Sequence, residues 1–386
     1  MSPKAQRENP LLSLIIPTRE RVETLAYTLT TALRQASWDY EILVSDNAST
    51  DGTAALVQSL TDPRVRYLNT GRRLSMCDNY EFAVEHSRGR YVLIIGDDDA
   101  VLPAGLDYLL ERLRRQSDAT VHMWPLHVYD WPAGYEKARL SYLAPQGSER
   151  VLALKVKARW VVQMGGWKYY DLPSPYHCAT PRWILEALRS RTGRVFHSTQ
   201  PDVFTAMAIP AFADQAINVG RTVTMNGRSA RSNGRGFITQ TAHSNIDRFI
   251  QEYGAYQFHP TLSAAVSARA NMIPDAILIA KDMFPELYGD VEFGYEAMLA
   301  YVCRLRFESH LEILQKAAVI RKSHPVRIGP FLKYSAVHEI AVLRRHILNY
   351  LDLNKDLHRK IPNNISDFVD YLNRITPPPL LPHNVK

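Results

Sequence analysis

The sequence predicts an α/β fold followed by a helical C-terminal region. In the first hundred residues, short apolar, β-branched runs alternate with segments whose apolar residues recur at helical spacing. From about residue 249 onward the spacing is helical and is punctuated by prolines. The alternation is typical of a parallel sheet with right-handed crossovers, which binds ligands at the carboxyl ends of its strands. A chain of 386 residues is too long for one small core, so we expect two domains, 1–250 and 251–386.

Four apolar runs in the N-terminal third are the expected strands. They span residues 11–17, 40–45, 65–68 and 90–95. Helices are expected between them, at residues 21–36, 53–60 and 78–87. In the C-terminal region the expected helices are 262–272, 277–284, 295–304, 310–321, 334–351 and 365–375.

The overall composition is that of a folded globular protein. Hydrophobic residues make up 46% and charged residues 22% of the chain, which excludes an intrinsically disordered protein. A formal net charge of +7 fits a protein that handles acidic ligands or rests on an anionic membrane surface. No signature of a nucleic-acid-binding module accompanies this charge, so we expect no nucleic-acid partner.

Cysteine usage and hydropathy predict the compartment. Cys77, Cys178 and Cys303 lie far apart and lack metal-ligand spacing, which indicates buried thiols in a reducing compartment. Residues 1–10 lack the apolar core of a signal peptide, and no later stretch is apolar for long enough to span a bilayer. We therefore expect a cytoplasmic protein, for which any contact with the inner face of the cell membrane is peripheral.

Three consecutive aspartates, Asp97 to Asp99, directly follow the fourth expected strand and Gly96. They should lie at the carboxyl edge of the sheet, where their like charges repel one another. A divalent cation would neutralise the cluster, and oxygen ligands suit Mg²⁺ or Mn²⁺. The alternative is a solvated acidic turn that caps the next helix.

Three motifs occur in order along the N-terminal third: Ile15 to Arg19, the polar loop from Val44 to Thr53, and Gly96 to Asp99. Together they resemble family 2 glycosyltransferases with a GT-A fold, a Rossmann-like mixed sheet flanked by helices. The resemblance is clearest over residues 12–113 and looser to about residue 250. It implies inverting transfer of a sugar from a nucleoside-diphosphate donor, with UDP expected, to a saccharide or lipid-linked glycan hydroxyl, as in bacterial surface polysaccharide synthesis.

The resemblance also implies a donor-binding set. Asp46 matches the acid that accepts a hydrogen bond from the donor base, although an Asx-turn or helix-cap role is the alternative. For Asp51 this structural role, an Asx-turn or helix cap, is preferred. Arg72 or Arg73 is expected to pair with the diphosphate, or else to form an exposed basic turn; Asp78 stands where many relatives have an arginine. The full set is Pro17, Thr18, Glu20, Asp46, Arg72, Arg73, Asn79, Asp97 and Asp98.

Within the triplet, the family pattern implies that Asp99 binds the metal directly. Asp97 then contacts the donor ribose or, through water, the metal, and Asp98 supports both. Some GT-A enzymes supply a histidine as a further ligand, and His243 is the candidate in this chain. The implied cofactor is Mn²⁺ or Mg²⁺.

An inverting transfer needs a base that deprotonates the acceptor. The family supplies it about a hundred residues after the triplet, at the start of a helix, where this chain has Pro201 and Asp202. Asp202 is therefore the expected base, with a first-turn helix acid as the alternative role. Asp171 and Asp214 are its rivals.

Two further segments are candidates for substrate contact. Residues 120–181 are rich in aromatic rings, some of which could line an acceptor groove next to a tight turn at Gly165 and Gly166. Residues 226–236 form a glycine-rich loop with three arginines, which either closes over the diphosphate or is a simple surface loop.

The role of the C-terminal region stays open between acceptor positioning, homo-oligomer formation and membrane contact. Two alternative functions predict features that the sequence lacks. A sugar-1-phosphate nucleotidyltransferase predicts a glycine-rich loop after the first strand, and residues 17–20 contain no glycine. A catalytically silent glycan-binding protein predicts a damaged acidic triplet, and this triplet is intact.

Overall fold

The computed structural model describes residues 9–116, 120–232, 249–351 and 361–375. The predicted strands in the N-terminal third are present as β1 (Leu12–Thr18), β2 (Tyr40–Asp46), β3 (Val65–Asn69) and β4 (Tyr91–Ile94). The helices between them are α1 (Val22–Leu33), α2 (Thr53–Gln58) and α3 (Met76–His86).

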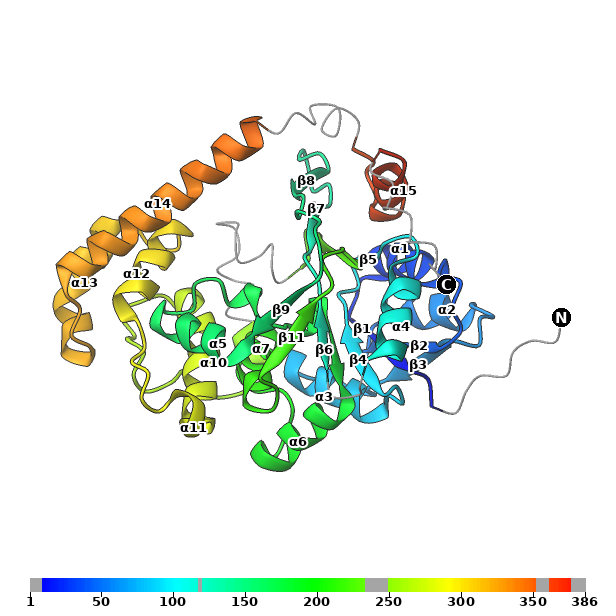
Figure 1. Cartoon of the computed structure of the whole chain (residues 1–386), viewed down its shortest axis with the longest axis horizontal. Helices are drawn as coiled ribbons and strands as arrows, with labels where there is room; N and C mark the ends of the chain where they lie inside the picture. The colour runs from blue at the N-terminus through cyan, green and yellow to red at the C-terminus, as the bar shows by residue number, and fades with distance from the viewer. Residues whose placement is uncertain (1–8, 117–119, 233–248, 352–360, 376–386) are drawn as a thin grey trace.

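The main sheet has eight strands in the order β3-β2-β1-β4-β10-β6-β11-β9 (Figure 1). Its added strands are β6 (Val121–Met123), β9 (Arg150–Ala153), β10 (Cys178–Pro181) and β11 (Gln215–Asn218). Strands β1 to β4 are parallel, whereas β10 runs antiparallel to both β4 and β6. The predicted α/β fold with a mixed sheet flanked by helices is confirmed.

Strand register explains why the polar residues of the N-terminal third meet at one edge. Thr18 pairs with Asp46, and Asp46 pairs with Asn69, each at the carboxyl end of its strand. Ile15 pairs with Ile94, so the chain leaves β4 beside the end of β1 and enters the acidic triplet there. Parallel strands bring their carboxyl ends to one edge, and this edge is therefore polar.

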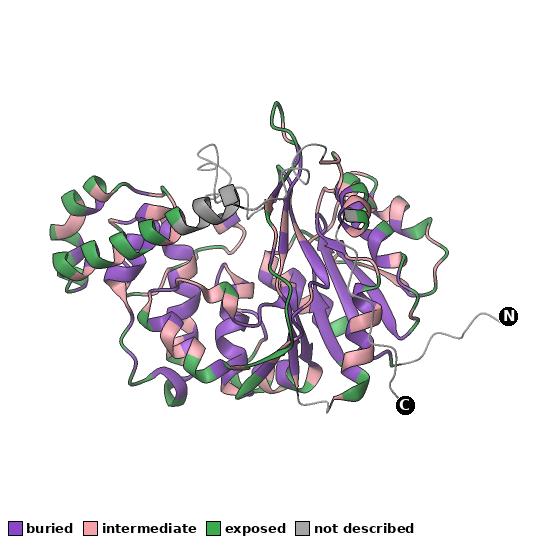
Figure 2. Cartoon of the chain, turned by 45° about the horizontal axis from the view of Figure 1, so that its top comes forward, coloured by how far each residue is buried: buried purple, intermediate pink, exposed green. Residues whose placement is uncertain are grey.

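Helices cover both faces of the main sheet. One face packs against α1, α2 and α4 (Gly105–Arg115). The other packs against α3, α5 (Leu154–Gln163), α6 (Arg182–Thr192) and α7 (Pro201–Ala208). The strands are accordingly buried on both sides (Figure 2). Three short 3₁₀ turns, Tyr169–Asp171, Pro175–His177 and Ile209–Ala211, link these elements.

A second sheet of four strands joins distant segments beside the triplet. Its order is β5-β12-β7-β8, from β5 (Ala100–Val101), β12 (Thr224–Arg228), β7 (His127–Asp130) and β8 (Arg139–Tyr142). Met225 of β12 pairs with Ala100, directly after the last aspartate. The second sheet therefore carries residues 224–228 to the acidic cluster.

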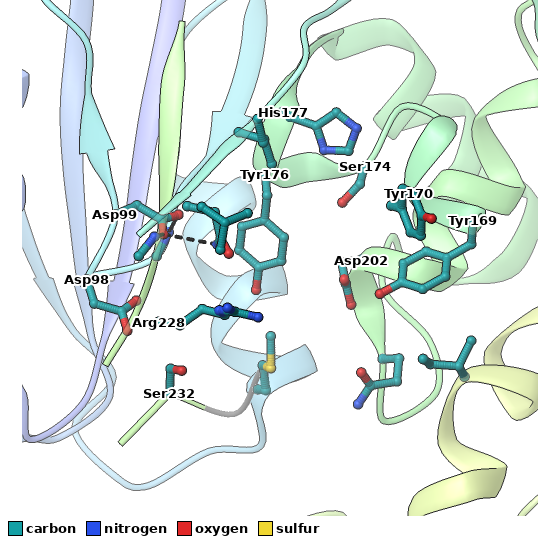
Figure 3. A pocket seen from close by; sticks show the side chains of 18 of the residues that line it. Asp98, Asp99, Tyr169, Tyr170, Ser174, Tyr176, His177, Asp202, Arg228 and Ser232 are labelled. Carbon is teal, nitrogen blue, oxygen red and sulfur yellow. Dashed lines mark hydrogen bonds between the residues drawn. The ribbon is translucent and has the colours of Figure 1, made fainter. Parts of the chain in front are cut away.

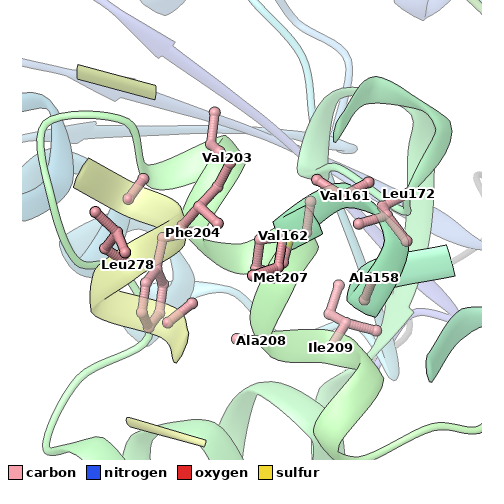
Figure 4. Packing of buried hydrophobic residues seen from close by; sticks show 14 of the residues in the cluster. Ala158, Val161, Val162, Leu172, Val203, Phe204, Met207, Ala208, Ile209 and Leu278 are labelled. Atoms are coloured by element: carbon pink, nitrogen blue, oxygen red, sulfur yellow. The ribbon is translucent and has the colours of Figure 1, made fainter. Parts of the chain in front are cut away.

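The C-terminal region is helical, as predicted. Its helices are α10 (Ala268–Met283), α11 (Pro285–Tyr288), α12 (Tyr295–Arg304), α13 (His310–Ser323), α14 (Ile328–Leu351) and α15 (Ile365–Ile375). The prediction of two helices, 262–272 and 277–284, was wrong, because α10 runs continuously through Pro274. Buried residues on both sides of this proline pack against α7, and that burial outweighs the backbone hydrogen bond that proline cannot donate (Figure 4).

The predicted start of the long helix at residue 334 was also wrong. Helix α14 begins at Ile328, and Pro330 lies in its first turn, where a missing N–H has no helical partner to lose. No helix among the described residues is long and apolar enough to cross a membrane. Cys77, Cys178 and Cys303 are buried free thiols, as expected.

The C-terminal helices share a core with the rest of the chain. One apolar cluster contains Val162 of α5, Met207 of α7 and Leu278 of α10 (Figure 4). Further on, α15 returns to the N-terminal part, where Phe368 stacks on Tyr129 with ring centroids 5.0 Å apart. The predicted boundary at residue 250 stays a prediction, and packing is continuous across it.

Candidate active site

The carboxyl edge of the main sheet opens into a cavity of about 1690 Å³. The acidic triplet lines one side and Asp202 the other, with aromatic side chains on the walls between them (Figure 3). Most of the predicted site residues line this cavity: Pro17, Thr18, Glu20, Arg73, Asn79, Asp97, Asp98, Asp99 and Asp202. Asp46 and Arg72 do not line it. His243 lies outside the described residues.

Asp97 is held by two side chains from the first strand and the turn that follows it. Thr18 Oγ1 donates to Asp97 Oδ2 at 2.7 Å, and Arg21 donates from its guanidinium to Oδ1, also at 2.7 Å. Burial raises the pKa of Asp97, while the Arg21 charge opposes that rise. Arg21 was not identified from the sequence. Its place three positions past the end of β1 is all that separates it from other basic residues, and this is no distinctive signal.

Asp98 and Asp99 are held by backbone N–H groups of Gly96, of β12 and of the residue after β12. The amide of Gly227 donates to Asp99 Oδ1 at 2.7 Å, and that of Gly96 donates to Oδ2 at 2.7 Å. The amide of Ser229 donates to Asp98 Oδ2 at 2.9 Å. A Cβ at Gly227 would lie 1.7 Å from the carbonyl oxygen of Asp98, so only glycine permits this approach. Strand β12 thus fixes the triplet.

The triplet fits a divalent cation by its chemistry. All three side chains are buried, and burial together with the Asp98 charge raises the pKa of Asp99 to about 8. A cation bound there would favour the ionised carboxylates. The described residues contain no ready-made group of three acidic, histidine or cysteine ligands. The triplet therefore fits a cation that substrate oxygens also coordinate, as Mg²⁺ sites commonly do.

Asp46 has a local structural role in the polar loop. Its carboxylate accepts from the amide of Ser49 at 2.9 Å and from the hydroxyl of Tyr67 at 2.6 Å. This is the Asx-turn alternative, so base recognition by Asp46 stays a prediction. The structural role preferred for Asp51 is confirmed as an Asx-turn, because Asp51 accepts from the amide of Thr53, two residues on, whereas the N-cap of α2 is Gly52.

The basic residues near the triplet have acidic or carbonyl partners. Arg73 and Arg19 both donate to Glu252, with Arg19 at 2.9 Å. Arg231 donates to the carbonyl oxygen of Glu20 at 2.8 Å. Glu252, which also lines the cavity, was missed, because a single acid about 180 positions from Arg73 carries no sequence signal. Arg72 is exposed, in keeping with the basic-turn alternative.

Asp202 occupies the first turn of α7, directly after Pro201, as predicted. Burial raises the pKa of Asp202 to about 6, although the N–H of Val203 stabilises the carboxylate and opposes this rise. This value suits a group that must accept a proton near neutral pH.

Tyr80 and Tyr176 lie close enough to both Asp202 and the triplet to interact with the charges of both. Burial raises the pKa of Tyr80 and Tyr176, and the charges of Asp202 and Asp99 both add to the rise. The two phenols hydrogen-bond each other, and Figure 3 shows Tyr176 between the two acidic groups. The cavity therefore brings together two acidic groups that lie about a hundred residues apart in sequence.

The rivals of Asp202 have ion-pair partners. Asp171 lines the cavity and accepts from Lys157 Nζ at 2.7 Å. Asp214 pairs with Lys155 at 2.6 Å, is 77% exposed, and does not line the cavity. Among these three, only Asp202 combines a place in the cavity with freedom from an ion pair.

The aromatic wall rests on the predicted glycine turn. Gly165 and Gly166 have φ values of 60° and 96°, which confirms the tight turn. A Cβ at Gly165 would lie 2.4 Å from the carbonyl oxygen of Gly294, so the turn contacts the C-terminal region closely. The turn leads into Tyr169 and Tyr170, which line the cavity. Others among the aromatic residues, such as Tyr129, are buried in the core.

Comparison with known proteins identifies the family. Residues 13–165 match the model of glycosyl transferase family 2. Residues 13–165 are therefore a glycosyl transferase family 2 domain. The resemblance drawn from the motifs is thereby confirmed, and so is the presence of a glycosyltransferase domain.

Similarity to individual relatives is confined to part of the chain. The succinoglycan biosynthesis protein ExoO of Rhizobium meliloti is 30% identical over 112 residues, which cover 29% of this chain and 32% of that protein. The GalNAc(5)-diNAcBac-PP-undecaprenol beta-1,3-glucosyltransferase of Campylobacter jejuni is 33% identical over 106 residues, 27% of this chain and 34% of that enzyme. The chain thus matches about a third of the length of these relatives.

Among solved structures, residues 1–349 of S. aureus TarS in complex with UDP-GlcNAc align with 86% of this chain and 92% of that one. The sequence identity is 12% and the TM-score is 0.49. A similarity at this level adds nothing to the family assignment.

Proposed function

We propose that the chain is a metal-dependent, inverting glycosyltransferase. It moves a sugar from a nucleoside-diphosphate donor, with a UDP-sugar as the first candidate, to a hydroxyl of a saccharide or lipid-linked glycan. The observation that carries this proposal is the single cavity that joins the acidic triplet to Asp202. An inverting transfer needs a site for the donor diphosphate and, on the other side of the donor sugar, a base for the acceptor hydroxyl. This cavity supplies both kinds of group.

The triplet is the proposed site of Mn²⁺ or Mg²⁺, which would neutralise charge on the departing diphosphate. Both oxygens of Asp97 and of Asp99 already accept hydrogen bonds. Within the described residues, no donor reaches the second carboxylate oxygen of Asp98. Asp98 therefore joins Asp99, the ligand implied by the family pattern, as a candidate for direct contact with the cation.

On the donor side, Thr18 and Arg21 orient Asp97, which suits a contact with the ribose. Arg73 and Arg231 line the cavity and offer the forked donors that bind diphosphate oxygens well. On the opposite side, Asp202 is the proposed base, because it lines the cavity, is free of an ion pair, and has a pKa raised by desolvation to about 6.

The acceptor is proposed to bind along the aromatic wall of Trp160, Tyr169 and Tyr170, whose rings suit the C–H faces of a sugar. One relative is named for its action on an undecaprenol-diphosphate-linked glycan. A lipid-linked acceptor in bacterial surface polysaccharide synthesis follows as the specific form of the proposal. Such an acceptor requires the enzyme to work at the inner face of the cell membrane.

The outer faces of α13 and α14 are the proposed membrane contact. Eight of the sixteen exposed large apolar side chains in the described residues lie on these two helices. Leu332, Ile340 and Leu343 follow one side of α14, and each is at least 53% exposed. Exposed basic residues accompany them: Arg321, Lys322 and Lys333. Apolar side chains flanked by basic ones suit an anionic lipid surface.

A donor screen tests the proposed activity. Nucleoside-diphosphate sugars are offered with Mn²⁺, Mg²⁺ or EDTA, and both binding and release of the nucleoside diphosphate are measured. We expect metal-dependent release from one donor class. If no donor binds in the presence of either metal, the proposal is wrong. Turnover that needs pyrophosphate would favour a sugar-1-phosphate nucleotidyltransferase, and glycan binding without turnover would favour a silent glycan-binding protein.

Vesicle sedimentation tests the membrane contact. We expect binding to vesicles that contain phosphatidylglycerol, weak binding to phosphatidylcholine alone, and loss of binding in a Leu332→Glu/Ile340→Glu variant. Val151→Glu is the matched control, because Val151 is 61% exposed on β9. If the double variant instead dissociates a lipid-free oligomer, the face is an interface between copies of the chain.

A further inference from the structure

Asp275 is a buried carboxylate of α10 for which the proposed transfer has no direct use. It is fully buried and accepts from Ser198 Oγ at 2.7 Å, from the amide of His259 at 2.8 Å and from the hydroxyl of Tyr256. Taking a carboxylate out of water is costly unless it is hydrogen-bonded in this way. The Asp275 carboxylate therefore ties together the segments that donate hydrogen bonds to it.

Ser198 is the most informative of these partners. Its backbone is left-handed, with φ at 64°, a conformation that costs a residue other than glycine about 1 kcal/mol or more. The bond to Asp275 fixes its side chain, and its carbonyl oxygen accepts from Cys77 Sγ at 2.9 Å. Ser198 is thus fixed from α10 on one side and from α3 on the other.

The fixed residue lies just ahead of the proposed base. Only Thr199, Gln200 and Pro201 separate Ser198 from Asp202. Thr199 is fully buried, and the ring of Pro201 restricts the backbone at the first position of α7. A shift of Ser198 is therefore passed to the start of α7. Among the described residues, no side chain holds the Asp202 carboxylate directly, so its place depends on this backbone.

We infer that Asp275 is a positioning residue that sets the place of Asp202 through Ser198. The inference rests on the proposed role of Asp202 as the base. It makes the C-terminal helices a working part of the catalytic site, because α10 supplies the carboxylate that fixes the 198–201 segment. A base displaced by about 1 Å can lower the rate of transfer by roughly 100-fold.

The test uses Asp275→Asn in the full-length chain, with Asp282→Asn as the matched control. Asp282 lies on the same helix and accepts from His259 Nε2 at 2.9 Å, but it is 65% exposed and has no bond to Ser198. We expect Asp275→Asn to lower kcat by about 10- to 100-fold. Donor affinity should stay within about threefold, because the triplet is held by β12 and not by α10. Asp282→Asn should change neither quantity.

Two further variants separate positioning from a general loss of structure. Ser198→Ala removes the hydroxyl that contacts Asp275, so it should lower kcat as well, and the double variant should lose no more than the larger single loss. In an Asp202→Asn background, Asp275→Asn should not lower the residual rate further. Near-normal kcat in both Asp275→Asn and Ser198→Ala overturns the inference, as does a parallel loss of donor binding. If Asp202→Asn is itself fully active, the proposed base is wrong and the inference falls with it.

Discussion

The two acidic groups of the cavity are built in opposite ways. The triplet has its oxygens bonded by amides of Gly96, Gly227 and Ser229 and by side chains of the first strand and its turn. Asp202 has only the N–H groups of its own helix turn, and its position comes from a short loop. Carboxylates that are held in place suit a site where a cation must neutralise the charge of the departing diphosphate. A carboxylate with few partners suits proton transfer, because its lone pairs stay open to the acceptor.

The difference also lies in where the supporting residues come from. The triplet depends on β1 and β12, whereas Asp202 depends on α3 and α10. A substitution can therefore disturb the position of the triplet and leave Asp202 in place, or the reverse. Donor binding and the rate of transfer should respond separately.

The largest expected effect is on the rate of transfer. Asp202→Asn should lower kcat by about 10²- to 10⁴-fold, because the amide cannot take the acceptor proton. Donor affinity, measured by calorimetry with Mn²⁺, should stay near that of the unchanged chain. A kcat within tenfold of normal would remove Asp202 as the base.

The next effect concerns the triplet. In Gly227→Ala the new Cβ meets the carbonyl oxygen of Asp98, so β12 must shift and its amide leaves Asp99. We expect the free energy of unfolding to fall by about 1–3 kcal/mol, with weaker donor binding. Gly329→Ala is the control, since no atom lies within 4 Å of its Cβ and it belongs to α14. Equal behaviour of the two variants in chemical denaturation would show that β12 does not fix the triplet.

The pH dependence of kcat should report Asp202. Burial raises its pKa to about 6, so the carboxylate is the main form above that pH and the inactive acid is the main form below it. We expect kcat to fall about tenfold for each pH unit below this value. The rate should be measured at saturating donor and metal over pH 5–8. A kcat that stays level down to pH 5 would contradict a base with this pKa.

The smallest expected effect comes from the rival acid. Asp171→Asn removes a partly exposed pair with Lys157, which contributes about 0–1 kcal/mol. We expect kcat and donor affinity within about threefold of normal. A loss as large as that in Asp202→Asn would assign the base to Asp171 instead.

Some parts of the site follow from local sequence. The strand that ends before Gly96, the first-turn position of Asp202 and the turn at Gly165 were all expected from short patterns. Each depends on residues within about ten positions, so the sequence carries the signal directly.

Other parts have no local signal. Arg21 and Glu252 reach the cavity only because the fold places them there. The continuity of α10 through Pro274 follows from burial on both sides of the proline, which local rules do not include. Asp46 lies at the predicted strand end, yet its carboxylate is bonded by Ser49 and Tyr67 and does not line the cavity.

The sequence by itself determined the resemblance to family 2, the succession of strands and helices in the N-terminal third and the acidic cluster that follows the fourth strand. These depend on apolar periodicity and short motifs, whose physical causes act over a few residues. Only the tertiary structure decided how that cluster is held and what fixes Asp202. Gly227 and Asp275 lie far from their partners in sequence, and only packing between sheets and helices brings an amide to Asp99 and a carboxylate to Ser198.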